Sequence, residues 1–486
     1  MINSTRRYSS LAIAFCITFQ LSGCSADENR GNAHSEVLED AVLLYQYQFT
    51  ETGRVSDGTD AINYFGAPRF YGPMEARGFT YNNYQYASYY EANGNIVIER
   101  RNLDNPDVWE KSILQGYRIT SNDRHNRISM GVSAGDGVIH LAFDHHNSPT
   151  MNYARTEKGV GDNPENVTWD NEVFSLAPNL GLEDPIQRVT YPSFHSIGGT
   201  GDLILYWRSG SAASGVMNMA HYDSNTQEWF FIGKASSRYG VYDGEMKTRG
   251  PYHGGLEPDS KGNIHVQLLW REFPGHIRAE KGIRYGNHGL YYTYSNDGGF
   301  TWFNNSGEKV VDLREVDIRA QDNEEAAMKK ISIETLDRVV DIPMRMEPSN
   351  PSQTSAVDLE TDEFHAILRH HKKDTTDFYL HHYIRSTEGE WSVRVIDAFD
   401  SNRPEIYFAG DLLYALLYDG SIYVSTRERS FTDWKEINMP VSLSDSLNYY
   451  DMTRIGDGVI SIFSHNVPAE RGDATPIEVR DIQIAQ

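Results

Sequence analysis

The sequence predicts an all-β protein, a seven-bladed β-propeller with a short helical insertion in one blade. Three observations favour this fold class: the amino-acid usage, a strand signature that recurs seven times, and a tryptophan that recurs between the strands. The 486 residues include 40 Gly and 30 Tyr, and 12% of them are aromatic, a usage typical of strands and turns. A chain of this length exceeds one ordinary hydrophobic core, so several domains or one repeated architecture is expected.

The first 24 residues are predicted to be a lipoprotein-type signal peptide. Arg6 and Arg7 precede an apolar run over residues 11–21, and Leu21-Ser22-Gly23-Cys24 resembles a bacterial lipobox. Because Ser25 follows the cysteine, we expect an exported lipoprotein of the outer membrane or cell surface, with the lipid anchor as its membrane contact. An ordinary signal peptide cleaved nearby, with release from the cell, is the alternative.

Residues 25–40 are expected to be a polar tether, and residues 41–486 a single propeller domain. Both cysteines, Cys16 and Cys24, lie in the signal segment. The mature chain can therefore form no disulfide, thiolate nucleophile or cysteine-ligated zinc site. The formal net charge of −24 makes nucleic acid a poor partner. We expect the protein to be a monomer.

A strand signature marks each predicted blade: a glycine, aspartate or asparagine is followed by an aliphatic strand. Some copies carry a histidine inside the strand, so His140 is expected to be scaffold, like its counterparts His265 and His365. Units of about 45 to 65 residues with several short strands match four-stranded propeller blades. The seven copies are residues 94–98, 137–141, 201–205, 262–266, 362–366, 410–414 and 456–460.

A tryptophan follows a turn-rich, acidic stretch in most of these units. One copy, Ser295–Trp302, is close to an Asp-box, a hairpin turn in which Asp and Ser bond one another while the Trp packs into the blade. The motif favours a propeller and carries no information about chemistry. The recurring residues are Trp109, Trp169, Trp229, Trp302, Trp391 and Trp434.

Two segments at the ends of the domain are predicted to close the ring of blades. Residues 42–47 and 477–484 both alternate between apolar and polar side chains, as paired strands do. The unit between Trp302 and Trp391 is longer than the others. Its excess, around residues 315–336, has a helix-like composition and is expected to be an insertion on one face.

Four strand ends carry histidine, aromatic or cationic side chains at matching positions of the repeat. Because propeller blades converge on a central axis, these ends predict a lined pocket; the alternative is that each is a satisfied polar group at a strand end. Tyr191 in VTYPSF, and Tyr252 and His253 in RGPYHGG, are expected in loops between the aliphatic strands. The aligned ends are His145-His146, His370-His371, Trp270-Arg271 and Tyr206-Trp207-Arg208.

An inventory of Arg, His and Tyr favours β-elimination from a uronic acid. A glycoside hydrolase normally needs two carboxylates at a fixed separation, and no such pair stands out. In β-elimination, an Arg pairs with the uronate carboxylate and stabilises the charge that develops when the C5 proton leaves. A His or Tyr removes that proton, and another protonates the departing O4. This chemistry requires no metal or cofactor.

The motifs RHNRISMGVS, DGVIHLAFDHHN, VTYPSF, LYWRSG and RGPYHGG resemble those of the seven-bladed propeller ulvan lyases, in the group with a His-Tyr-Arg site. The resemblance covers roughly residues 40 to 486. It implies a polysaccharide lyase whose partner is an anionic sulfated polysaccharide, ulvan, built from rhamnose 3-sulfate and glucuronic or iduronic acid. Because some members hold a structural metal ion, a site of unknown identity without cysteine ligands is left open.

The resemblance also implies roles for individual residues. His125 would be the histidine beside the uronate, as base or positioning group, and His145 the second histidine. Tyr191 would donate a proton to O4, and Arg208 would neutralise the carboxylate. Substrate-binding roles are implied for a further set, Tyr252, Arg271, Asn63, His146 and His253.

Two other functions fit parts of the sequence. A sialidase-like glycoside hydrolase also folds as a propeller with Asp-boxes, but it needs an arginine triad and a Tyr–Glu pair. A non-catalytic surface lipoprotein that binds glycans would use the same aromatic and arginine contacts without turnover.

Overall fold

The computed structural model describes residues 41–53, 78–91, 93–119, 123, 125–197, 199–243, 246–282, 286–317, 321–349, 354–401, 403–417, 419–443, 446–466 and 475–484. These residues belong to one compact unit, Leu38–Gln486. The predicted signal peptide and tether lie outside the described residues, and the expected domain boundaries stay a prediction. None of the described helices is long and apolar enough to cross a membrane.

Seven sheets of four or more strands and one two-stranded hairpin are found among the described residues, and paired strands within them run antiparallel. The first sheet contains β2 (Gly78–Tyr81), β3 (Tyr84–Tyr90), β4 (Ile96–Asn102) and β5 (Trp109–Ile113). The second contains β6 (Ile128–Ser133), β7 (Val138–Phe143), β9 (Tyr153–Arg155) and β10 (Ser175–Leu176). The third contains β8 (His146–Ser148), β11 (Val189–Ser196), β12 (Leu203–Ser211), β13 (Ser214–Asp223) and β14 (Glu228–Lys234).

The hairpin of β15 (Tyr239–Tyr242) and β16 (Met246–Thr248) precedes the fourth sheet. That sheet contains β17 (Gly250–His253), β18 (Glu257–Pro258), β19 (Ile264–Glu272), β20 (Gly286–Ser295), β21 (Thr301–Asn304), β22 (Lys309–Asp312) and β23 (Arg338–Val340). The fifth contains β24 (Ser355–Asp358), β25 (Glu363–His371), β26 (Phe378–Arg385) and β27 (Trp391–Ile396). The sixth contains β28 (Glu405–Ala409), β29 (Leu412–Leu416), β30 (Ile422–Thr426) and β31 (Lys435–Glu436). The seventh contains β32 (Ser446–Asp451), β33 (Val459–Asn466), β34 (Thr475–Gln483) and β1 (Val42–Gly53).

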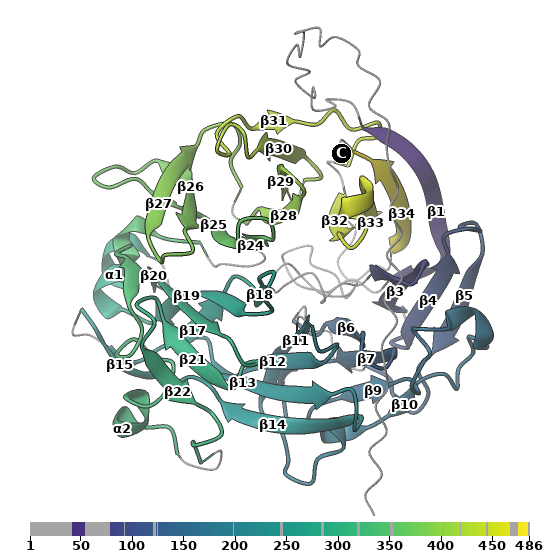
Figure 1. Ribbon diagram of the computed structural model, residues 1–486, viewed down its shortest axis with the longest axis horizontal. Helices are drawn as coiled ribbons and strands as arrows, with labels where there is room; N and C mark the ends of the chain where they lie inside the picture. The colour runs from purple at the N-terminus through teal and green to yellow at the C-terminus, as the bar shows by residue number, and fades with distance from the viewer. Residues whose placement is uncertain are drawn as a thin grey trace, which may run out of the picture. The chain divides into compact units, whose positions relative to one another are not determined.

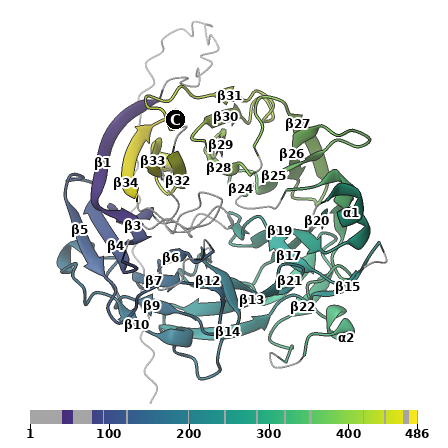
Figure 2. The ribbon, with the colours of Figure 1, turned by 180° about the vertical axis from the view of Figure 1, so that it is seen from behind.

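The predicted all-β propeller is confirmed. The sheets follow one another around the unit in chain order (Figure 1), and their apolar faces pack against the next sheet, as Met217 of β13 does against Trp270 of β19. The predicted closure is also correct, because β1 pairs antiparallel with β34 from Val42 opposite Gln483 to Gly53 opposite Thr475. Figure 2 shows β1 beside β34 from behind.

The Asp-box forms the hairpin turn that its sequence predicts. Asp297 accepts hydrogen bonds from Ser295 Oγ (3.1 Å) and from the amide of Thr301 (2.7 Å). The Trp302 indole, fully buried, donates to the Gly299 carbonyl at 2.8 Å. This network fixes the β20–β21 turn without any ligand.

The histidines of the strand signature are scaffold, as predicted. His140 is fully buried, and its Nδ1 lies 2.6 Å from Tyr153 Oη. His365 is equally buried and bonds His382 at 2.9 Å. Each imidazole is thus held through its Nδ1 atom by a side chain on a neighbouring strand.

The long unit contains the predicted short helix, α2 (Glu324–Ala327), within the expected insertion. Asn323 caps it by accepting a hydrogen bond from the Ala326 amide at 2.8 Å. A second helix, α1 (Gly275–Lys281), was not predicted and connects β19 to β20. Short 3-10 turns lie at Pro164–Asn166, Pro178–Gly181, Met344–Met346 and Ile455–Asp457.

Candidate active site

Strand β8 connects two neighbouring sheets at the place where the candidate residues gather. It follows β7 in the chain but pairs with β11 of the next sheet. Between them Asp144 has a left-handed backbone (φ +59°), and its amide donates to Tyr90 Oη (3.0 Å) and to the Arg127 carbonyl (3.2 Å). Beyond this fixed turn, His145 is buried and His146 is exposed.

Asp123 connects His125 and His146 through its two carboxylate oxygens. Nδ1 of His125 lies 2.5 Å from Asp123 Oδ1, and Nδ1 of His146 lies 2.5 Å from Oδ2. The two imidazole rings stack with their centroids 3.9 Å apart. An ionised carboxylate only accepts hydrogen bonds, so both Nδ1 atoms carry hydrogen. In a neutral imidazole with hydrogen on Nδ1, the Nε2 atom is a proton acceptor.

Tyr191 lies beside this pair where its backbone leaves regular strand geometry. Its φ is +56°, and the register between β11 and β12 shifts between Thr190 and Ser193. A left-handed backbone at a non-glycine residue costs about 1 kcal/mol or more and is concentrated at functional sites. The Tyr191 ring centroid is 6.0 Å from that of His125 and 6.4 Å from that of His146.

Three arginines surround the rings of Tyr191 and Tyr252. Cζ of Arg127 lies 4.4 Å from the Tyr191 ring centroid, and Cζ of Arg208 lies 5.7 Å from it. Arg208 Nη1 also donates to Tyr252 Oη at 2.9 Å. Cζ of Arg271 lies 4.2 Å from the Tyr252 ring centroid. In a strongly acidic chain, these guanidinium groups create a local cationic site that suits an anionic ligand.

Adjacent strands place these side chains at one level of the sheet. Thr190 of β11 is opposite His146 of β8 on one side and Arg208 of β12 on the other. Tyr252 comes from β17, which begins at Gly250. A Cβ atom at Gly250 would lie 2.3 Å from the Ala212 carbonyl oxygen. Glycine therefore permits the close approach that brings Tyr252 to Arg208.

A hydrogen-bond chain holds Arg271 against the ring of Tyr252. Arg271 Nε donates to Asn287 Oδ1 at 2.8 Å, and Asn287 Nδ2 donates to the Pro348 carbonyl at 2.8 Å. The amide of Asn287 thus fixes the guanidinium against the ring. The hydrogen bond from Arg271 to Asn287 restricts movement of the guanidinium group when a ligand binds. This restriction favours a preformed site.

Burial and charge set the protonation states of the cluster. Burial lowers the pKa of His125, opposed by its hydrogen bond to Asp123, so the ring is neutral at neutral pH. The pKa of the Asp123 carboxyl is held well below its usual range by the hydrogen bonds from His125 and His146, which outweigh burial. Burial raises the pKa of Tyr191 against the opposing charges of Arg127 and Arg208. The site therefore combines a neutral imidazole with a protonated phenol.

The structure brings most of the predicted site residues together but places two histidines elsewhere. His145 is buried, its Nε2 accepts a hydrogen bond from the Asn152 amide at 2.8 Å, and burial lowers its pKa to about 3. The imidazole stacked on His125 belongs to His146 instead. His253 is buried with its ring against Tyr206, 4.1 Å between centroids. Asn63 lies outside the described residues, and the predicted roles of all these residues stay predictions.

Sequence reasoning missed Asp123 and Arg127. Both lie in the polar segment around His125, at alternate positions, and the signal that could have found them is this Asp-x-His-x-Arg spacing. In the structure this segment turns, because the Asn126 amide donates to the Asp123 carbonyl at 3.0 Å. Nothing in the sequence alone connects Asp123 to His146, which is 23 residues away.

The Asp123, His125 and His146 group also has the ligand types of a metal site. One donor atom from each lies within 4.8 Å of the others. In the present arrangement, however, the carboxylate oxygens and both Nδ1 atoms bond one another at 2.5 Å. A metal ion on these atoms would have to displace the two Nδ1 protons, so the geometry fits a hydrogen-bonded triad better than a preformed metal site.

Comparison with curated proteins finds relatives that are named ulvan lyases. An ulvan lyase, long isoform, of Glaciecola sp. (strain KUL10) is 24% identical over 332 residues, which are 57% of this chain and 32% of that protein. An ulvan lyase, long isoform, of Alteromonas sp. (strain LOR) is 26% identical over 56% of this chain and 31% of that protein. The chain thus spans about a third of the length of these relatives.

Among solved structures, the polysaccharide lyase Uly1 has a TM-score of 0.64 and 18% identity, covering 91% of this chain and 99% of that one. An ulvan lyase of family PL25, bound to -[GlcA(1-4)Rha3S]-, has a TM-score of 0.57 and 12% identity over 90% of this chain and 96% of that one. At such identities, these likenesses establish a shared fold. The model of the BNR repeat-containing family matches residues 84–398. By this match, which takes in the sheets that form the candidate site, the chain belongs to the BNR repeat-containing family.

Proposed function

We propose that this protein is a polysaccharide lyase that cleaves ulvan by β-elimination at its uronic acid residues. The observation that carries the proposal is the convergence of two imidazoles, a buried phenol and three guanidinium groups at one end of β8, β11, β12 and β17. The relatives named ulvan lyases support the substrate class.

Arg208 is assigned to the uronate carboxylate. Its guanidinium already bonds Tyr252 Oη, so it is oriented before the substrate arrives, and its full charge opposes the negative charge that builds up as the C5 proton leaves. Arg127, whose Cζ lies 4.4 Å from the Tyr191 ring centroid, adds to the same field.

The imidazoles of His125 and His146 are assigned to the base. A neutral Nε2 atom takes the C5 proton, and the C5–H electron pair forms the C4=C5 double bond while the C4–O4 bond breaks. Asp123 then stabilises the new imidazolium, as a carboxylate does in other base–orienter pairs. Because the stacked rings share one carboxylate, the pair accepts one proton more readily than two.

Tyr191 is assigned to the departing O4. Its pKa is raised by burial, so the phenol keeps its proton at neutral pH and can deliver it to the leaving group. The product is a 4,5-unsaturated uronate, and the phenolate regains a proton from the imidazolium or from water.

The decisive experiment measures the ultraviolet absorbance of the unsaturated uronate when the protein is incubated with ulvan. Tyr191→Phe is expected to lower the rate by about 10²–10⁴-fold, while Tyr423→Phe, in β30, serves as the matched control. A wild-type protein that binds ulvan without forming the product would instead indicate a glycan-binding module. An unchanged rate in Tyr191→Phe would remove Tyr191 from the mechanism.

A further inference from the structure

A cavity of about 860 Å³ lies at the same end of the third sheet as the candidate active site. The strands β12, β13 and β14 form its floor, the loop over residues 182–188 one wall, and residues 238–239 and 321–322 another. Its volume lies in the range of pockets that bind small ligands or sugar residues.

The cavity and the active site are on opposite faces of one sheet. Arg208 of β12 belongs to the active site, whereas its strand neighbours Trp207 and Ser209 line the cavity, as alternation along a strand requires. Arg188, on the cavity wall, connects the two places. Its Nε donates to Asn147 Oδ1 at 3.2 Å, one residue beyond His146. Arg188 therefore lies in the cavity wall and is bonded to the strand that carries His146.

Unpartnered polar atoms occupy the far end of the cavity. Arg238 and Asp322 form a loose pair, with Arg238 Nε 3.7 Å from Asp322 Oδ2, and the Asp322 side chain is 8% exposed. In the described part of the chain, neither Arg238 Nε nor Asp322 Oδ1 has a hydrogen-bond partner. Buried polar atoms are normally satisfied, so a donor for Asp322 Oδ1 and an acceptor for Arg238 Nε are missing. A sugar hydroxyl supplies both.

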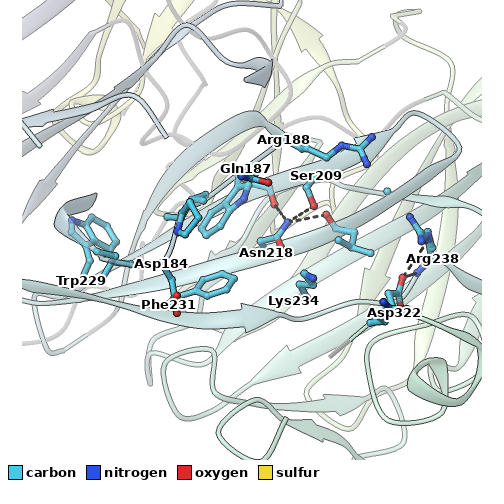
Figure 3. A pocket seen from close by; sticks show the side chains of 18 of the residues that line it. Asp184, Gln187, Arg188, Ser209, Asn218, Trp229, Phe231, Lys234, Arg238 and Asp322 are labelled. Atoms are coloured by element: carbon cyan, nitrogen blue, oxygen red, sulfur yellow. Dashed lines mark hydrogen bonds and ion pairs between the residues drawn. The ribbon is translucent and has the colours of Figure 1, made fainter. Parts of the chain in front are cut away.

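Lys234 provides a positive charge next to this pair. It is half-buried at the end of β14, and no ion pair of its ammonium is found within the described ranges. Figure 3 shows Lys234 between Phe231 and the Arg238–Asp322 pair. The acidic residues Glu183 and Asp184 are exposed at the opposite rim. An anionic group is therefore favoured at the Lys234 end of the cavity.

We propose that this cavity is a second binding site for the polymer, in which Lys234 pairs with a sulfate ester and the Arg238–Asp322 pair bonds a hydroxyl of the same sugar. Phe231, stacked on Trp207 with ring centroids 5.6 Å apart, offers an apolar surface for the ring. The identity of this ligand rests on the proposed lyase function. The second site would hold a part of the polysaccharide that is remote from the bond that is cleaved.

The test compares Lys234→Gln and Asp322→Asn with wild type on ulvan and on a size series of its oligosaccharides. Lys373→Gln, an exposed lysine between β25 and β26, is the matched control. Both cavity variants are expected to raise KM for the polymer, by roughly tenfold for a lost charged hydrogen bond, at unchanged kcat. The difference in KM between the cavity variants and wild type should vanish below a threshold oligosaccharide length. On chemically desulfated ulvan, Lys234→Gln and wild type should have the same KM.

An unchanged KM for the polymer in Lys234→Gln would overturn the second site, as would an equal rise in KM on oligosaccharides of every length. If wild type forms no unsaturated product from ulvan, the lyase proposal fails by itself. The cavity is then tested by calorimetric binding of long sulfated ulvan fragments. Weaker binding to Lys234→Gln than to Lys373→Gln supports the site, and equal binding contradicts it.

Discussion

At the scale of single residues, Asp123 sets the tautomer and the orientation of the two histidines of the site, His125 and His146. One carboxylate accepts the Nδ1 hydrogens of both His125 and His146, which fixes the tautomer of each ring. The stacked arrangement also makes a second protonation costly, because two imidazolium rings at 3.9 Å would repel. Asp123 is therefore a positioning residue rather than a group that touches the substrate.

We expect Asp123→Asn to lower kcat on ulvan by about 10²-fold or more with little change in KM. An amide has one acceptor oxygen where the carboxylate uses two, its NH₂ group faces one of the Nδ1–H groups as a second donor, and it has no charge to stabilise an imidazolium. Since the Asp123 hydrogen bond raises the pKa of His125, its loss should move the acidic limb of the pH–rate profile to lower pH. Asp170→Asn, at an exposed turn, is the control. An Asp123→Asn profile that superimposes on that of wild type would contradict this role, and ¹⁵N spectra of the imidazoles report the tautomer independently.

The pKa shifts of His125 and Tyr191 predict the pH range of the proposed lyase activity. His125 must be neutral to accept a proton, and burial lowers its pKa, so activity should be lost only below the ordinary histidine value of about 6.5. Tyr191 must be protonated, and its raised pKa keeps it so up to and beyond about pH 10. We expect a plateau between these limits, and a rate that falls between pH 7 and 9 would contradict the assignments.

At the scale of secondary-structure elements, a buried ion pair connects the start of β17 to β19 and β20. Arg249, next to β17, donates from Nε to Glu272 Oε1 of β19 at 2.8 Å, and His288 Nε2 of β20 lies 3.2 Å from the same oxygen. The Arg249 and Glu272 side chains are fully buried. This cluster anchors the strand that carries Tyr252.

Removing one partner of a buried pair leaves an uncompensated charge, which typically costs 3–5 kcal/mol. We therefore expect Glu272→Ala to lower the free energy of unfolding by about that amount. The exposed Lys247–Glu324 pair supplies the control, since Glu324→Ala should change stability by less than about 1 kcal/mol. Chemical denaturation followed by tryptophan fluorescence measures both, and similar midpoints for the two variants would argue against the anchoring role.

At the scale of the whole propeller, the closure between the last sheet and the first depends on more than the β1–β34 pairing. Asp481 of β34 accepts two 2.8 Å hydrogen bonds from Arg101 of β4, and a further one at 2.8 Å from Arg454. Arg101 is fully buried, and its guanidinium lies 4.1 Å from the Tyr45 ring centroid of β1. One carboxylate thus joins three segments at the seam of the ring.

We expect Asp481→Ala to lower Tm markedly, because Arg101 would keep a buried charge at a cost of about 3–5 kcal/mol. Limited proteolysis should then cut first at the seam, within β1 or β34. Asp400→Ala removes an exposed partner of Arg369 and should leave Tm within about a degree or two of wild type. Proteolysis that begins elsewhere in the propeller would contradict the seam as the weak point.

The repeats explain why the fold could be predicted so fully from the sequence. The glycine-led strands, the Asp-box at Ser295–Trp302 and the alternation of residues 42–47 are local patterns, and each forms locally the structure that it indicates. Helix α1 carries no such pattern: without a side-chain cap, it depends on its tertiary setting. Helix α1 was therefore not predicted from the sequence, because no local pattern indicates it.

The sequence by itself determined the propeller, the sheet ends that meet at the site, and the residue types of an Arg-His-Tyr chemistry. Only the tertiary structure decided which histidine lies beside His125, because His145 is buried after the left-handed turn at Asp144 and His146 stacks on His125. It also decided that Asp123 joins His125 to His146, and that Lys234, Arg238 and Asp322 share one cavity. These contacts are between residues far apart in the chain, and a single sequence records local pattern rather than the packing that brings distant segments together.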